Sequence, residues 1–276
     1  MILRISSRRE AVRRFGPPAA IRVEGAGRRG RTLLSILGGL VLWEFVARFV
    51  VHDPAFLAPP SIALLRIWEM LLSGTLLIHA GVSGEEFLVG YVLGCGSGIL
   101  LGAAMAAWRP VDDLLSPWVF ALNAAPIVAL APIIILWFGI GVASKVAVVI
   151  FLVIFTLSVN TEVGIRSADQ HLVTLARSFG ATRRQIFFTV SLPWAVPFIV
   201  SGLRLAVGRA LIGVVVGELF GARAGLGYVI TDASQVFDMP TLFAAVIILA
   251  GAGIVLTSLL RALERRLAVW RAPAQE

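Results

Sequence analysis

Six long apolar blocks constrain what this chain can fold into more than any other feature. They run over about 32–51, 83–107, 115–138, 144–165, 194–218 and 241–261. Each block supplies the roughly 20 residues that a helix needs to cross the hydrocarbon core of a bilayer. Charged residues make up only 14% of the chain, whereas they make up about 25% of a typical soluble domain. Because a helix satisfies its own backbone hydrogen bonds in lipid, the blocks predict an all-α membrane protein with six transmembrane helices.

The basic residues predict on which side of the membrane each connecting segment lies. Of the 24 lysines and arginines, eighteen lie in 1–31, 108–114, 166–193 and 261–276, and three lie in 52–82, 139–145 and 219–240. Basic residues concentrate in cytoplasmic loops. We therefore expect a multi-pass protein, in contact with membrane lipid, whose two termini are cytoplasmic. The same distribution accounts for the net charge of +8, so no nucleic-acid partner is expected.

These spans and loops divide the chain into four segments. Residues 1–31 are predicted to be a basic cytoplasmic tail without a cleaved signal peptide, and 263–276 a second cytoplasmic tail. Residues 32–74 hold the first span and then Pro59-Pro60-Ser61, which predicts a stop followed by a helix cap. Residues 75–262 form the main transmembrane domain. A short helix lying in the outer interface is predicted after the cap from apolar residues at helical spacing, namely Ile62, Leu65, Trp68, Leu71 and Leu72.

The sequence indicates neither catalysis nor metal binding. The single cysteine, Cys95, cannot form an internal disulfide, and the three histidines are scattered without metal-ligand spacing. A membrane enzyme would need a convergent nucleophile or metal site. The only lysine is Lys145, preceded by Ser144, so the Gly-Lys pair of a P-loop is absent and this chain is not expected to hydrolyse ATP.

Glycines recur every four residues in the second block. On a helix such a stripe lets another backbone approach closely, so it predicts a helix–helix seam, and one that could slide. The alternative is the ordinary glycine enrichment of membrane helices. The stripe consists of Gly90, Gly94, Gly98 and Gly102, and a shorter one in the fifth block consists of Gly213, Gly217 and Gly221.

Charges inside the spans each need a partner or a purpose, because a charge at the bilayer centre costs about 2.5–3.5 kcal/mol on insertion scales. Glu44 and Arg48 are four residues apart and are expected to neutralise each other. Arg204 and Arg209 lie five residues apart in the fifth block, and therefore point to different faces of a helix. They either form an anion-attracting wall or are buried against Glu162, Glu218 or backbone carbonyls, and both interpretations stay open.

The largest predicted cytoplasmic loop, 166–193, carries two short amphipathic helices. Ser167 and Gln170 have the spacing of a capping box, and Thr182 and Gln185 repeat it. Gly180 suits the left-handed turn between the two helices, and Leu192-Pro193 is expected to end the second. An apolar face outside the bilayer needs a partner. This face is made by Leu172, Leu175, Ala176 and Phe179 in the first helix and by Ile186, Phe187 and Val190 in the second.

The same loop resembles the "EAA" loop of binding-protein-dependent ABC importer permeases. The chain is most similar to the sulfonate, taurine and nitrate uptake permeases, from about His79 to Trp270. The residues that carry the resemblance are Leu175 to Ala181 and Val190-Ser191-Leu192-Pro193 in the loop, and elsewhere Leu136 to Gly141, Asn160-Thr161, Arg166-Ser167, Gly202-Leu203-Arg204, Gly208-Arg209-Ala210, Glu218 and Gly225 to Tyr228. Two stretches depart from the pattern, since Thr174 replaces the usual acid and Asn123-Ala124-Ala125-Pro126 replaces a proline-rich run.

The resemblance implies a type I ABC importer permease fold and a bacterial cytoplasmic (inner) membrane location. It implies a homodimer of permeases, two ATP-binding-cassette ATPase subunits that use ATP and Mg, and an extracytoplasmic solute-binding protein. This chain itself would bind no cofactor and no metal, and it would carry a small anionic solute such as a sulfonate, taurine or nitrate. Together with the amphipathic face and the charges inside the spans, it predicts ATPase coupling at Leu172, Leu175, Ala176, Arg177, Phe179, Gly180 and Ala181, and a translocation pathway at Asn123, Asn160, Arg204, Arg209 and Glu218.

An ion-gradient-driven secondary transporter is the alternative. Such a protein needs intramembrane acids or a polar cluster for its coupling ion, usually with broken helices. The predicted spans offer few acids, and a secondary transporter would leave the amphipathic loop 166–193 unexplained.

Overall fold

The computed structural model describes residues 25–53 and 55–267, and it divides into two compact units, Met1–His52 and Asp53–Glu276. In the first unit, α1 (Gly25–Val46) continues into a π-helical turn, η2 (Ala47–Val51). The predicted pair is confirmed, because Arg48 Nε lies 2.6 Å from Glu44 Oε1. Residues 25–31 are helical, so the predicted tail ends earlier than expected, and most of both tails lies outside the described residues.

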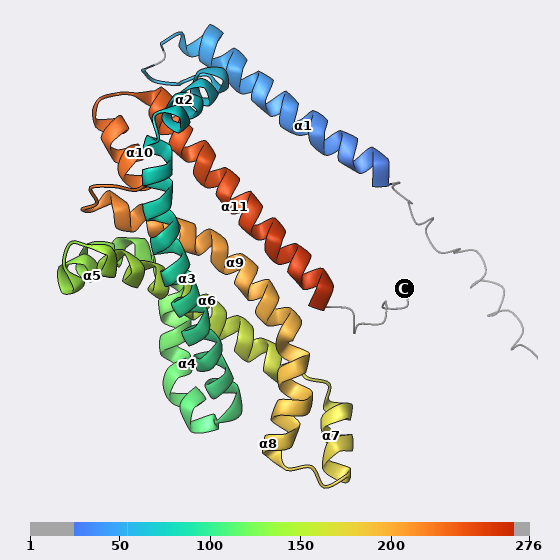
Figure 1. The fold of residues 1–276 in the computed structure, drawn as a ribbon. Helices are drawn as coiled ribbons and strands as arrows, with labels where there is room; N and C mark the ends of the chain where they lie inside the picture. The colour runs from blue at the N-terminus through green and yellow to red at the C-terminus, as the bar shows by residue number, and fades with distance from the viewer. Residues whose placement is uncertain (1–24, 54, 268–276) are drawn as a thin grey trace, which may run out of the picture. The chain divides into compact units, whose positions relative to one another are not determined.

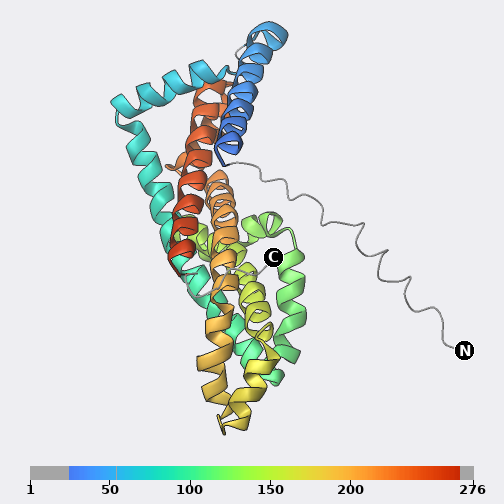
Figure 2. The same cartoon turned by 90° about the vertical axis from the view of Figure 1, so that its right-hand side faces the viewer.

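The second unit is a bundle in which every regular element of the described residues is helical (Figures 1 and 2). In chain order its elements are α2 (Pro60–Leu72), α3 (Thr75–Ala107), α4 (Arg109–Ala124), η3 (Ile127–Leu130), α5 (Ala131–Phe138), α6 (Val142–Arg166), α7 (Gln170–Ser178), α8 (Arg183–Ile186), η4 (Phe187–Ser191), α9 (Leu192–Leu219), α10 (Leu226–Gln235) and α11 (Met239–Leu267). The predicted all-α membrane architecture is therefore confirmed.

Five of the six predicted spans are helices long and apolar enough to cross a membrane, and the sixth is bent. The five are Gly30–Val51, Thr75–Ala107, Val142–Arg166, Arg183–Leu219 and Met239–Ala262. The predicted span over 115–138 corresponds to a bent pair of helices, Arg109–Ala124 and Ile127–Phe138, which meet at 92°. Proline has no N–H to donate and disfavours helical backbone in the residue before it. Ala125, before Pro126, is accordingly extended.

Helix α6 lies against both α3 and α9, and glycines set the distances. A Cβ built at Gly90 would lie 2.6 Å from the Cβ of Val149, and one at Gly98 would lie 2.6 Å from the carbonyl oxygen of Ile154. Gly94 and Gly102 face α6 in the same way. The stripe therefore lets the backbones of α3 and α6 touch within one chain.

The shorter glycine stripe meets α6 from the other side. A Cβ at Gly213 would lie 3.0 Å from Val149 Cα, and one at Gly217 would lie 3.1 Å from Lys145 Cα. Gly221 follows the end of α9 and faces Ile140. Helix α6 is therefore held between two helices that both approach its backbone.

A buried cluster of charges lies at the end of this three-helix core that the distribution of basic residues predicts to be the outer end. Lys145 Nζ lies 2.7 Å from Glu86 Oε1, and the two residues are 7% and 1% exposed. Lys145 was predicted in an outer loop, but it lies in the first turn of α6 because that helix begins at Val142. Glu218, also 1% exposed, accepts hydrogen bonds from Ser83 Oγ at 2.6 Å and from the backbone N–H of Gly227.

The opposite end of α6 carries a second cluster of two acids and one base. Arg166 is ion-paired with Asp112 at the start of α4 and, at 3.1 Å, with Glu162 one turn earlier in α6. Its Nη2 also donates to the carbonyl oxygen of Met105 in α3. The last turn of α6 is thereby tied to the connection between α3 and α4.

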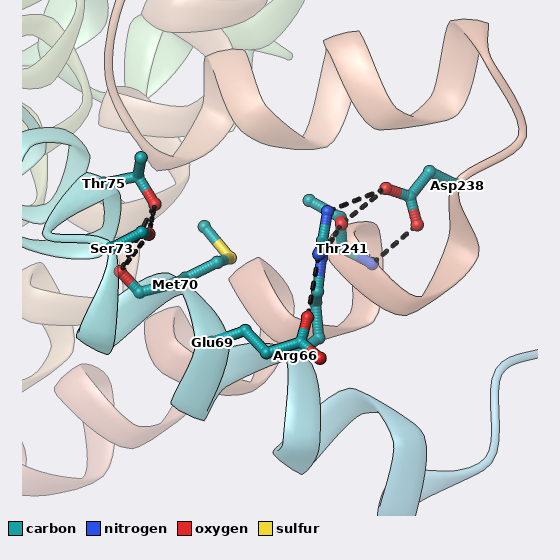
Figure 3. A network of polar contacts seen from close by, with 7 residues as sticks. All are labelled: Arg66, Glu69, Met70, Ser73, Thr75, Asp238 and Thr241. Carbon is teal, nitrogen blue, oxygen red and sulfur yellow. Dashed lines mark hydrogen bonds and ion pairs between the residues drawn. The ribbon is translucent and has the colours of Figure 1, made fainter.

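Helix α2 is fastened to the start of α11 by the polar network in Figure 3. Arg66 donates to Thr241 Oγ1 at 2.8 Å and lies 2.9 Å from Glu69 and 3.6 Å from Asp238. Asp238 in turn accepts from the Thr241 hydroxyl at 2.6 Å. The predicted amphipathic helix is present, but it begins at Pro60 and not after a Ser61 cap.

We expect Gly98→Leu to destabilise the protein, because the side chain would meet the backbone of α6. Overpacking typically costs about 1–3 kcal/mol. The matched control is Gly96→Leu, since Gly96 lies on the exposed side of the same helix with nothing within 4 Å. Thermal unfolding in detergent should show a lower midpoint for the first variant only. Equal midpoints would mean that α3 and α6 do not depend on this close approach.

We expect Lys145→Met to lower stability by about 3–5 kcal/mol, because it leaves the Glu86 carboxylate buried without its cation. The double variant Lys145→Met, Glu86→Gln removes both charges and should recover most of the loss. Yield and unfolding midpoint of the purified protein measure both. A single variant as stable as the unmodified protein would contradict the assignment of Glu86 and Lys145 as a mutually dependent pair.

Candidate functional site

Helices α7 and α8 form a hairpin at the end of the second unit that is predicted to be cytoplasmic (Figures 1 and 2). The turn between them is left-handed at Gly180, with φ of +79°, as predicted. The predicted capping box at Thr182 and Gln185 is also confirmed, since each side chain bonds the other's backbone N–H.

The cap of α7 differs from the prediction. Asp169, not Ser167, accepts a hydrogen bond from the backbone N–H of His171 at 2.8 Å. Gln170 donates to the carbonyl of Ala168 and does not complete a capping box. Asp and Ser are about equally good at this position, so spacing alone could not choose between them.

The hairpin has a small apolar core of its own. Ala168, Val173 and Ile186 are buried in it, and Ala176, Ala181 and Val190 pack against them. Two of the predicted coupling residues, Ala176 and Ala181, therefore hold the hairpin together.

The other apolar coupling residues remain on the surface of the hairpin. Phe179 is 83% exposed, and Leu172 and Leu175 are 43% and 54% exposed. Arg177 is exposed beside them. We call Leu172, Leu175 and Phe179 the apolar patch of the hairpin. Its exposure outside the span helices is typical of a protein-binding surface.

The second helix of the hairpin does not end at Leu192-Pro193, so that prediction is wrong. Residues Arg183–Leu219 form one apolar helix of 37 residues that includes α8, η4 and α9. The π turn explains the continuity: the Leu192 N–H bonds the carbonyl of Phe187, five residues earlier. Pro193 therefore lies inside this continuous helix, just after the π turn. The hairpin is therefore joined directly to a spanning helix.

Two of the five predicted pathway residues meet. Arg209 Nη1 of α9 donates to Asn123 Oδ1 at 3.0 Å, and Asn123 lies two residues before the bend at Ala125. No carboxylate of the described residues lies within ion-pair distance of Arg209. This guanidinium, half-buried in a span, thus has a neutral partner.

Arg204 has a different environment. Its Nη1 lies 3.1 Å from Glu264 Oε2 of α11, and its Nη2 is 3.4 Å from Ser201 Oγ. Neither Glu162 nor Glu218 pairs with Arg204 or Arg209, so the prediction of these two acids as partners is wrong. Glu264 was assigned to a C-terminal tail, but it extends α11.

The remaining pathway residues lie elsewhere. Asn160 of α6 donates to the carbonyl of Thr156 at 2.8 Å and packs against Gly202 of α9. Glu218 belongs to the buried outer cluster. The five residues do not form one continuous wall in a single chain, and their role in solute passage stays a prediction.

Several residues of the outer cluster were not predicted from the sequence. Glu86 lies inside an apolar block, which is itself a signal, but nothing local pairs it with Lys145. The backbone N–H groups of Gly225 and Leu226 bond His79 Nδ1 and Ser83 Oγ at 3.1 and 2.8 Å. These contacts seat the Gly225-Leu226-Gly227 turn on the carboxylate of Glu218, where a Cβ at either glycine would collide with it.

Curated proteins resemble this chain over most of its length. A formylaminopyrimidine transport permease protein of Halalkalibacterium halodurans is 36% identical over 84% of this chain and 92% of its own. A riboflavin transport system permease protein of Chloroflexus aurantiacus is 36% identical over 84% and 87%. The taurine transport system permease protein of Escherichia coli is 30% identical over 86% and 88%.

Solved transporters share the fold. An inward-facing MetNI methionine ABC transporter matches with a TM-score of 0.54 and 20% identity, over 76% of this chain and 97% of that one. An amino acid ABC transporter crystallised with histidines matches with a TM-score of 0.57 and 18% identity, over 74% and 97%. The model of the binding-protein-dependent transport system inner membrane component family matches residues 98–269. With up to six apolar spans among its described residues, counting the bent pair as one, the chain belongs to this family of ABC importer permeases.

Proposed function

We propose that this chain is the membrane-spanning subunit of an importer that works as a permease homodimer with two ATPase subunits and an extracytoplasmic binding protein. The observation that carries the proposal is the exposed apolar patch of the hairpin. The core of the hairpin packs together without these side chains, so they remain on the surface. The proposal places the complex in the bacterial inner membrane with both termini of this chain in the cytoplasm, in agreement with the distribution of basic residues.

In this mechanism the ATPase subunits bind ATP and Mg, close, and displace the hairpin. The displacement passes into α9 because Arg183–Leu219 is one helix. Helix α9 reaches the outer cluster at Glu218 and is packed through glycines against α6. Motion of the core in each subunit then opens the dimer alternately to the two sides. This chain holds and moves the pathway, and it breaks no bond in the solute.

The solute is proposed to be small and anionic. Arg209 supports this class, because it places a fixed positive charge in a span and, among the described residues, hydrogen-bonds the neutral amide of Asn123. The named relatives carry taurine, formylaminopyrimidine or riboflavin, so relatives alone do not choose among solutes. The binding protein selects the solute in this scheme.

We expect Phe179→Asp to abolish ATP-driven uptake while the permease itself stays folded. Phe179 is 83% exposed, so its replacement removes no internal packing, but it places a charge where the ATPase should bury an aromatic ring. The measurements are co-purification of the cognate ATPase and solute uptake into proteoliposomes. Phe220→Asp, at an exposed phenylalanine beyond the outer end of α9, is the control.

The same proteoliposomes separate the proposal from an ion-gradient transporter. Uptake should require ATP with the ATPases and binding protein, and should persist when ionophores collapse ion gradients. Gradient-driven uptake by the permease alone would overturn the proposal. Normal co-purification and uptake by Phe179→Asp would instead remove the hairpin from the ATPase interface.

We expect Arg209→Gln to cut transport of an anionic solute about tenfold or more, with complex assembly and basal ATP hydrolysis retained. Arg209→Lys should rescue transport in part, because lysine keeps the charge but loses the planar fork that binds an oxyanion through two hydrogen bonds. The comparison with Arg204→Gln is informative, since Arg204 already has Glu264 as its partner and its loss should lower stability first. Equal uptake by Arg209→Gln and the unmodified protein would contradict the proposal that the solute is anionic.

A further inference from the structure

The hairpin presents three arginines that have no acidic partner on its own surface. Arg177, Arg183 and Arg184 are all exposed, and none is ion-paired with any described residue. The single acid between Ser167 and Ser191 is Asp169, whose carboxylate is occupied in capping α7. The apolar patch thus lies beside an unneutralised positive charge.

Two of these arginines lie where the helix itself disfavours them. Arg183 and Arg184 occupy the first turn of the helix Arg183–Leu219. The first turn of a helix favours acidic side chains and disfavours cations, because its unpaired N–H groups carry partial positive charge. The Thr182–Gln185 capping box pairs the N–H groups of Thr182 and Gln185 only, and its neutral side chains supply no negative charge to offset the two guanidinium groups. Arg177 differs, because it lies in the last turn of α7, where a cation is favoured.

The position that would have supplied an acid is Thr174, which is neutral. Beyond its capping residue Asp169, α7 therefore has no carboxylate that it could contribute to a contact with another protein. Charge complementarity favours the opposite arrangement, with the carboxylates on the other molecule. Arginine suits such a contact because its guanidinium binds a carboxylate through two parallel hydrogen bonds.

We propose that the ATPase subunit presents acidic side chains to Arg183 and Arg184, next to an apolar depression that receives Phe179. This inference rests on the proposed function, because it names the chemistry of the ATPase surface that meets the hairpin. Under this proposal, Arg183 and Arg184 destabilise the free permease and strengthen its binding to the ATPase. The alternative is that the arginines serve only to keep this loop in the cytoplasm. In that case their removal would not weaken binding to the ATPase.

The test uses the full-length permease and its cognate ATPase in detergent, with the double variant Arg183→Gln, Arg184→Gln. Its free permease should unfold at the same or a higher temperature than the unmodified protein. Its affinity for the ATPase should fall about tenfold and should depend less on salt, because charge pairs between proteins are screened by ions. Arg177→Gln is the matched control for the stability effect, and it should not raise the unfolding temperature because a cation is favoured in the last turn of α7.

A second variant, Arg184→Glu, separates the alternatives. It suits the helix start and should fold well, but it should repel an acidic partner and weaken binding more than Arg184→Gln does. Unchanged affinity and salt dependence in both variants, with the ATPase still bound by the unmodified permease, would overturn the acidic partner and leave the importer proposal intact. Tighter binding of Arg184→Glu would show a basic partner and would also overturn it. Failure of the unmodified permease to bind any ATPase would reject the proposed function itself.

Discussion

The backbone contact of α6 with α3 on one side and α9 on the other is the constraint on which the rest of the second unit depends. In lipid no hydrophobic effect pulls apolar helices together, so association relies on close van der Waals packing and on polar contacts. Gly90 and Gly98 let α3 reach the backbone of α6, and Gly213 and Gly217 do the same for α9. Side chains at these positions would separate the helices and would break the contacts that hold the two charge clusters at the ends of α6.

The two charge clusters tie each end of α6 to the neighbouring helices. Each holds one base and two acids, with Lys145, Glu86 and Glu218 at the outer end and Arg166, Asp112 and Glu162 at the other. A buried pair such as Lys145–Glu86 adds little net stability, but it makes a wrong register costly because a shifted helix would strand a charge. The glycines thus set how close the helices come, and the charges set their register along one another. A core fixed in both ways can carry a displacement from the hairpin along α9.

Local spacing explains which features could be predicted from the sequence. The six apolar blocks, the Glu44–Arg48 pair, the Gly180 turn and the Thr182–Gln185 box all depend on residues within a few positions of one another. Apart from the cap of α7, the errors arose where a partner lies far along the chain or where a proline can act in two ways. The bend at Pro126 within the span over 115–138 was not predicted, and a helix end was predicted at Pro193 where a π turn continues the helix. The pairs Lys145–Glu86 and Arg204–Glu264 join residues about 60 positions apart, which helical periodicity cannot connect.

The central claim is that α3, α6 and α9 of one subunit move as a single body when the ATPases act on the hairpin. Spin labels at Leu100 of α3 and Leu205 of α9, both exposed, measure this directly in a permease whose Cys95 is replaced by alanine. Labelled copies are diluted with unlabelled ones, so that each distance lies within one subunit. The account predicts the same distance in nucleotide-free complexes and in complexes trapped with ATP. A change approaching one helical turn, about 5 Å, would show that α9 slides against the core and would contradict it.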